Sequence, residues 1–352
     1  MSRPAPSADA GLVRPEPGVD YTRVLAGVGQ RPTDALVGLV AIAIWYVLLN
    51  PLITSVIVGV GWLLRRRPMA YADFSSAALN YQYPDGLAAG FVALAVFVPL
   101  AFALVRIVHR RDAAWLSSVR PGARWRYLIA VAGVAAVVMN VVYWVTSGRT
   151  DFHWGPQNNT WLWLGVVVVL APLQAAGEEY LFRGYLMQVI GAVVRQKWVV
   201  VVVSALVFTA MHGTQNLPLL LDRFAFGALM GALVVLTGGL EASIAAHAVN
   251  NLFAFGYAVL SGSVADALSI TEVSWAAAGA NVLAYAVVAV GAWGVARAMG
   301  LATLTPPAPG GPAQSQKPTS KPTLGNQSAG GGSRKPAART PKARPGRTPG
   351  TA

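Results

Sequence analysis

Long apolar runs, separated by short polar segments, fill most of the chain. A helix needs about 20 apolar residues to cross a hydrocarbon core of roughly 30 Å, and most of these runs reach that length. The runs predict eight spans: Ala35–Leu64, Gly86–Val108, Tyr127–Thr146, Thr160–Val194, Trp198–His212, Pro218–Thr237, Leu240–Leu260 and Trp275–Met299. The predicted fold class is therefore all-α, a polytopic membrane protein with about eight transmembrane helices.

The composition agrees with this interpretation. Hydrophobic residues make up 55% of the chain and charged residues only 12%, against about 25% charged residues in soluble domains. The chain has no cysteine, so it forms no disulfide and offers no thiolate as a metal ligand or nucleophile.

The two ends differ in composition from the membrane domain, which we place at residues 35–301. Residues 1–34 contain scattered prolines and a balance of acidic and basic residues, and we expect a flexible N-terminal segment. Residues 302–352 are rich in Pro, Gly, Ser, Thr and Ala, and their only charged residues are Lys and Arg. Such a segment buries too little apolar surface to offset its ordering entropy, so we expect a disordered tail.

The basic tail carries most of the net charge of +13. Attraction to anionic lipid at the cytoplasmic leaflet, worth about 1 kcal/mol for each basic residue near the surface, is the favoured interpretation. Nucleic acid is the alternative partner for such a tail, and we expect no specific nucleic-acid binding. The predicted partners are therefore membrane lipid and a membrane-associated substrate.

Basic residues near the ends of the spans predict the orientation. Arginines cluster after the second span, and Arg195 and Lys197 follow the fourth. Together they predict a multi-pass protein of the cell (plasma) membrane with both termini in the cytoplasm. Arg65, Arg66 and Arg67 disagree, because they follow the first span on the predicted external side. Either that span is long and tilted with arginines that reach the interface, or it does not cross as drawn.

Two adjacent carboxylates stand inside the fourth apolar run. Glu178 and Glu179 are followed by Arg183, although a charged side chain in the bilayer costs roughly 2.5–3.5 kcal/mol on insertion scales. Glu179 and Arg183 are four residues apart, a spacing that predicts an ion pair within one helix. Glu178 lies about 100° around the helix from Glu179. We therefore expect a functional site that lines a polar cavity.

Further polar groups occur in the fifth and seventh spans. His212 shares a helical face with Phe208, and His247 shares one with Asn251. If the fourth and fifth spans form an antiparallel hairpin, Glu178 and His212 lie at similar depths, about 25 and 22 Å from the turn. The same arithmetic places His247 and Asn251 only about 12–18 Å from the turn before their span, so a tilted helix or a sunken loop must bring them to the acidic pair.

These motifs, Glu-Glu-x-x-x-Arg, Phe-x-x-x-His and His-x-x-x-Asn, occur in the order found in the CAAX prenyl protease and bacteriocin-processing (CPBP) family of intramembrane proteases. The chain resembles a bacterial member of that family over residues 160–260. The resemblance implies eight helices around a polar cavity. It also implies hydrolysis of a peptide bond near the C-terminus of a membrane-associated protein or peptide.

Carried over by position, the resemblance makes Glu178 the general base, with Glu179 beside it in the catalytic set. His212 helps to hold the attacking water. His247 and Asn251 bind the scissile carbonyl and its oxyanion. Arg183 and Phe208 support the site.

Two questions stay open at this stage. Glu178, His212 and His247 form a credible zinc set, which fits the metalloprotease label of the family, and a metal-free reaction driven by glutamate and histidine is about equally favoured. An ion- or proton-coupled transporter, and a non-catalytic scaffold or bacteriocin-immunity protein, are the alternative functions. We interpret the polar residues outside the motifs as structural, with Asp222 and Arg223 at an interface and Asn250 in an interhelical hydrogen bond.

Overall fold

A computed structural model of the chain describes residues 12–307, except residues 28, 147–151 and 263. The described part is helical and contains no strand, only two isolated β-bridges. The all-α prediction is thus confirmed. The expected disordered tail beyond residue 307 lies outside the described residues.

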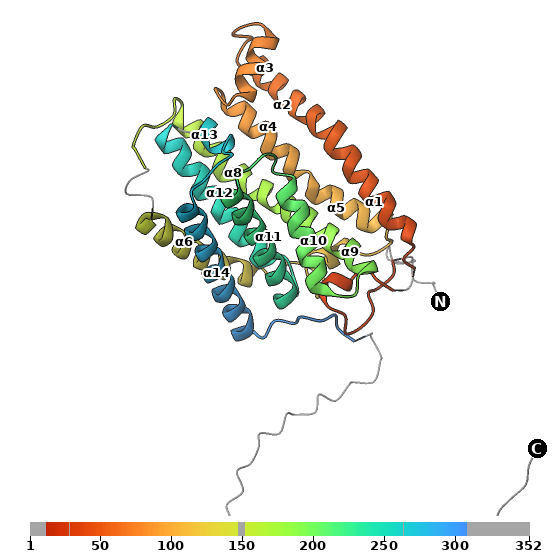
Figure 1. The fold of residues 1–352 in the computed structure, drawn as a ribbon. Helices are drawn as coiled ribbons and strands as arrows, with labels where there is room; N and C mark the ends of the chain where they lie inside the picture. The colour runs from red at the N-terminus through yellow and green to blue at the C-terminus, as the bar shows by residue number, and fades with distance from the viewer. Residues whose placement is uncertain (1–11, 28, 147–151, 263, 308–352) are drawn as a thin grey trace, which may run out of the picture. The chain divides into compact units, whose positions relative to one another are not determined.

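The helices follow one another along the chain as Figure 1 shows. Their bounds are α1 (Pro32–Ile44), the π-helix η2 (Trp45–Leu49), α2 (Asn50–Leu64), α3 (Tyr71–Leu79), α4 (Pro84–Ala95), α5 (Phe97–Ile107), α6 (Trp125–Thr146), α8 (Thr160–Glu179), the π-helix η4 (Tyr180–Leu186), α9 (Met187–Val193), α10 (Lys197–Ala210), α11 (Leu217–Thr237), α12 (Glu241–Ser261), α13 (Val264–Leu268) and α14 (Trp275–Ala298). Two short 3₁₀ helices, η1 (Tyr21–Arg23) and η3 (Ala113–Leu116), lie outside the spans.

Seven helical segments of the described chain are long and apolar enough to cross a membrane, one fewer than the eight expected. The exception is the fifth, because α10 has only 14 residues, about 21 Å of helix. The helix ends at Ala210, and Gly213 follows with φ of 76°, a left-handed conformation that glycine adopts easily. His212 therefore lies in the turn after α10 instead of on the helix.

The continuous helix formed by α8, η4 and α9 lies at the centre of the bundle and packs against α4, α5 and α12. Small residues permit the close crossings. A Cβ atom on Gly177 would lie 2.1 Å from the backbone oxygen of Leu94 in α4, so only glycine fits at this contact. The crossing places the end of α8, where the two glutamates lie, deep in the bundle.

The N-terminal segment is packed where the structure describes it. Tyr21 and Leu25 are completely buried, and Arg23 donates a hydrogen bond to the backbone oxygen of Gly191. Thr305, beyond α14, accepts a hydrogen bond from the backbone N–H of Val19. The described residues of the segment predicted to be flexible are therefore partly packed against the domain, and the packing includes Thr305, beyond the predicted domain end at residue 301. The domain bounds stay a prediction. Composition alone did not predict that apolar side chains of this segment pack against distant parts of the chain.

The arginines after the first span have partners within the protein. Arg65 forms an ion pair of 2.8 Å with Asp85 at the start of α4, and the guanidinium of Arg67 lies 5.1 Å from the ring centre of Trp62. The first span, Thr33–Leu64, has 32 residues, or about 48 Å of helix, which exceeds the hydrocarbon core. These contacts favour a long span with its arginines at the interface. The orientation of the termini stays a prediction.

Candidate active site

Glu178 and Glu179 occupy the last two positions of α8, immediately before the π-helix η4. A π-helical turn is rare and occurs frequently at functional sites. The local sequence gives no signal for a π-helix, because apart from Arg183 the residues Tyr180 to Leu186 continue the largely apolar pattern.

Glu179 is held by two partners. Its Oε1 accepts a hydrogen bond of 2.9 Å from Arg183 Nη1 and one of 2.8 Å from His247 Nδ1. The side chains of Glu179 and Arg183 are 0% and 1% exposed. The predicted ion pair within the helix is confirmed, and the bond to His247 joins it to α12.

Glu178 faces the open side of the site. Its side chain is 12% exposed and lines a cavity of about 550 Å³. Its Oε2 lies 3.6 Å from Nε2 of His247. The His247 ring thus stands between the two carboxylates. A carboxylate only accepts hydrogen bonds, so Nδ1 of His247 carries the proton in its bond to Glu179. Nε2 of the same ring faces Glu178.

His212 lines the same cavity as Glu178, as the predicted hairpin requires. Its Nδ1 donates a hydrogen bond of 2.7 Å to the backbone oxygen of Phe208, which leaves Nε2 as the acceptor nitrogen of the neutral ring. The backbone oxygen of His212 accepts a bond of 3.1 Å from Arg223. These bonds hold a residue that lies outside any helix.

Phe208 connects the parts of the site. Its ring centre is 4.4 Å from that of His212 and 4.1 Å from the guanidinium carbon of Arg183. It also packs edge-on against Phe182. Phe208 therefore covers the buried ion pair and packs against the His212 ring. Its supporting role in a reaction stays a prediction.

Asn251 is part of the same wall. Its Nδ2 donates a hydrogen bond of 2.8 Å to Gln174 Oε1, and its Oδ1 accepts one of 3.2 Å from Asn250. The loop before α12 packs against another segment, because the N–H of Leu240 donates to the backbone oxygen of Ser117 and Glu241 is 1% exposed. The bond between His247 and Glu179 shows that α12 reaches the acidic pair despite the mismatch that the turn arithmetic predicted.

Four further cavity residues were not recognised from the sequence. Gln174, Asp222, Arg223 and Asn250 line the cavity with Glu178, so the Asp222–Arg223 pair near the start of α11 also belongs to the cavity wall. The signal was present, because these two charges interrupt an apolar span. Asp222 is 6% exposed and its Oδ1 has no hydrogen-bond partner among the described residues.

The predicted zinc ligands are Glu178, His212 and His247. Among the described residues, no three His, Asp or Glu side chains are arranged to hold one metal ion. The Nδ1 atoms of His212 and His247 are both engaged by protein acceptors. Zinc therefore stays a prediction, and no step below passes through a metal.

Comparison with known proteins gives two matches. Residues 157–253 match a family model described as type II CAAX prenyl endopeptidase Rce1-like. The chain is also 29% identical over 101 residues to a Bacillus subtilis (strain 168) protein described as Uncharacterized protein YyaK. That alignment covers 26% of this chain and 33% of the relative, so the chain spans about a third of the length of the curated relative it matches. No solved structure gives a significant match.

The family match runs from the loop before α8 into α12. It contains Glu178, Glu179, His212, His247 and Asn251, the residues that carried the resemblance. Over residues 157–253 the chain is therefore similar to the Rce1-like family of type II CAAX prenyl endopeptidases.

Proposed function

We propose that this protein is an intramembrane endopeptidase that hydrolyses a peptide bond near the C-terminus of a membrane-associated protein or peptide, with a water activated by Glu178. The observation that carries the proposal is the difference between the two glutamates. Glu179 is buried and engaged by Arg183 and His247, whereas Glu178 lines the cavity within 3.6 Å of His247 Nε2.

The proposed reaction begins with proton transfer from water to Glu178. The water oxygen attacks the scissile carbonyl carbon, and the carbonyl oxygen becomes an oxyanion. Collapse of this intermediate breaks the C–N bond, and the proton on Glu178 passes to the leaving amine. The direct products are a carboxylic acid and an amine, and Glu178 is again a carboxylate, so atoms and charge balance. The new acid then passes its proton to the amine, which gives a carboxylate and an ammonium group.

The neighbouring groups support the charge that develops. Glu179 holds the His247 ring in one orientation and stabilises its protonated form, so that Nε2 donates to the oxyanion. Asn251 has a second N–H on Nδ2 beyond the one given to Gln174, and it supplies a further donor. His212, with Nε2 as an acceptor, helps to orient the water.

The test compares Glu178→Gln with Glu179→Gln in purified protein. Peptide substrates come from membrane proteins whose C-termini differ between cells with the wild type and cells with Glu178→Gln. We expect Glu178→Gln to lower kcat by about 10²–10⁴-fold, because an amide cannot accept the proton from water, with an unchanged thermal midpoint.

Glu179→Gln serves as the matched substitution. It leaves Arg183 buried without its partner, so we expect a loss of stability of about 3–5 kcal/mol. Equal and mild effects of the two changes would contradict the division of roles. Cleavage by Glu178→Gln at the wild-type rate would refute the proposed function and favour a scaffold or a transporter.

A further inference from the structure

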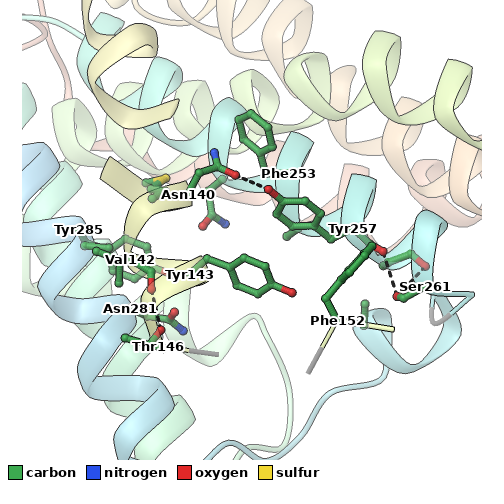
Figure 2. A pocket seen from close by; sticks show the side chains of 16 residues that line it. Asn140, Val142, Tyr143, Thr146, Phe152, Phe253, Tyr257, Ser261, Asn281 and Tyr285 are labelled. Atoms are coloured by element: carbon green, nitrogen blue, oxygen red, sulfur yellow. Dashed lines mark hydrogen bonds between the residues drawn. The ribbon is translucent and has the colours of Figure 1, made fainter. Parts of the chain in front are cut away.

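A second cavity of about 410 Å³ lies beside the catalytic one, between α6, α12 and α14 (Figure 2). The two cavities have a common wall. The residues that line both are Asn250, Ala254, Ala267, Asn281 and Tyr285. Asn250 also donates to the Oδ1 of Asn251, so the common wall includes the side chain next to the proposed oxyanion site.

The second cavity has a different chemistry from the first. Glu178, Asp222 and Arg223 line the catalytic cavity, whereas none of the described residues that line the second cavity is charged. Its polar groups are side-chain amides and hydroxyls, among them Asn140, Asn281 and Tyr257. An amide side chain both donates and accepts hydrogen bonds, as a peptide group does.

The aromatic side of this cavity is ordered by contacts between α6 and α12. Tyr143 stacks on Tyr257 with ring centres 4.9 Å apart and planes 15° apart. The hydroxyl of Tyr257 donates to Oδ1 of Asn140, the bond drawn in Figure 2. The ring centre of Phe253 lies 6.0 Å from that of Tyr257.

Asn140 donates one Nδ2 N–H to the backbone oxygen of Ala136, and Asn250 donates one to Asn251. Each Nδ2 carries a second N–H, which a peptide carbonyl can accept and an acyl chain cannot, so flat rings beside amides suit an uncharged peptide better than an acyl chain.

We propose that the second cavity binds the uncharged segment of the substrate that flanks the scissile bond on one side, with its asparagine amides hydrogen-bonded to the peptide backbone. The inference rests on the proposed peptidase function and adds a substrate class to it. A charged side chain placed there would lose its hydration without gaining a counter-charge. The cavity therefore selects neutral residues on that side of the cleaved bond.

The test introduces a charge into the cavity wall. Asn140 lines only the second cavity, and Asn140→Asp keeps the oxygen that accepts from Tyr257. Asn158→Asp, at an exposed position that lines neither cavity, is the matched control. All binding is measured in a Glu178→Gln background with a library of uncharged labelled peptides and counterparts that carry one Lys or one Glu. Cleavage sites are mapped with the wild type.

In the Glu178→Gln background we expect uncharged peptides to bind. A Lys at positions on one side of the scissile bond should weaken binding at least about tenfold. Asn140→Asp should restore binding of the Lys peptides about tenfold and weaken the Glu peptides further, because close charge pairs across an interface commonly contribute that much. Asn158→Asp should change neither.

The inference is overturned if uncharged peptides do not bind, or if Asn140→Asp leaves the preference for charge unchanged. Displacement of bound peptide by phospholipid, without any switch in charge preference, would assign the cavity to lipid and also overturn it. A switch in binding preference together with a wild type that cleaves nothing would instead keep the peptide site and refute the hydrolytic function.

Discussion

Glu178 and Glu179 are adjacent in the chain and chemically identical, so their roles come from their surroundings. Arg183 and His247 surround Glu179 in the interior, while Glu178 faces the cavity. The spacing of Glu179 and Arg183 was enough to predict their pairing. The bond from His247 to Glu179 joins residues 68 positions apart, and no local pattern encodes it.

Zinc can be tested at the scale of single residues. A zinc enzyme would contain about one equivalent of metal and would lose it in both His212→Ala and His247→Ala. The proposed metal-free reaction instead predicts full activity after metal removal. Metal analysis and peptide cleavage before and after chelation check this, with the exposed His153→Ala as control. Zinc loss that parallels activity loss would contradict the expectation.

At the scale of elements, the crossing of α8 over α4 positions the acidic pair. Gly177 stands directly before Glu178, and a Cβ there would press on the Leu94 backbone oxygen. We expect Gly177→Ala to lower stability by about 1–3 kcal/mol, the usual cost of overpacking, and to reduce kcat by displacing Glu178. Thermal unfolding and peptide cleavage measure the two effects.

Gly165→Ala is the control for this crossing, because Gly165 is in the same helix and has open space around its Cβ position. Alanine there should be neutral or stabilise the helix by up to about 1 kcal/mol. If both substitutions have the same effect, the loss comes from helix propensity and not from the contact with α4.

At the scale of the whole molecule, hydrogen bonds join the segment before the first span to the segment after the last span. Thr305 accepts from the backbone of Val19 and donates to the backbone oxygen of Glu16. Deletion of residues 303–352 should therefore lower the thermal midpoint, whereas deletion of residues 312–352 should leave both the midpoint and the catalytic rate in detergent unchanged. A large loss of cleavage after the shorter deletion would show that the tail acts on the site.

A titratable side chain, that of His109, lies near the same end of the molecule. His109 is 4% exposed, and its ring lies between Gln30 Oε1 and the hydroxyl of Tyr185. Burial lowers the pKa of His109 to about 4. Between about pH 6.5 and pH 4 the unfolded chain therefore binds a proton that the folded protein does not.

Stability should fall as the pH drops through this window, by up to about 1.4 kcal/mol per pH unit, and the contribution is fully present above about pH 6.5. Thermal unfolding at several pH values measures the slope. His109→Gln, which does not titrate, should lose this part of the slope. An equal slope in the variant would assign the pH dependence to other groups.

The sequence by itself determined the membrane class, the position of most spans, the ion pair between Glu179 and Arg183 and the three motifs that carry the family resemblance. These features depend on the length, periodicity and spacing of residues along one helix, and such properties are local. The packing of Tyr21 and Leu25 was missed, because their partners lie far away in the chain.

Only the tertiary structure decided which glutamate faces the cavity, how α12 reaches it and which other residues line it. The packing of the loop before α12 against residues 117–119, the early end of α10 at Ala210 and the contact of Gly177 with Leu94 set the relative positions of the helices. Relative position depends on how closely two backbones approach, and that distance is fixed by contacts between helices far apart in the chain. Asp222, Arg223 and Asn250 entered the site for this reason.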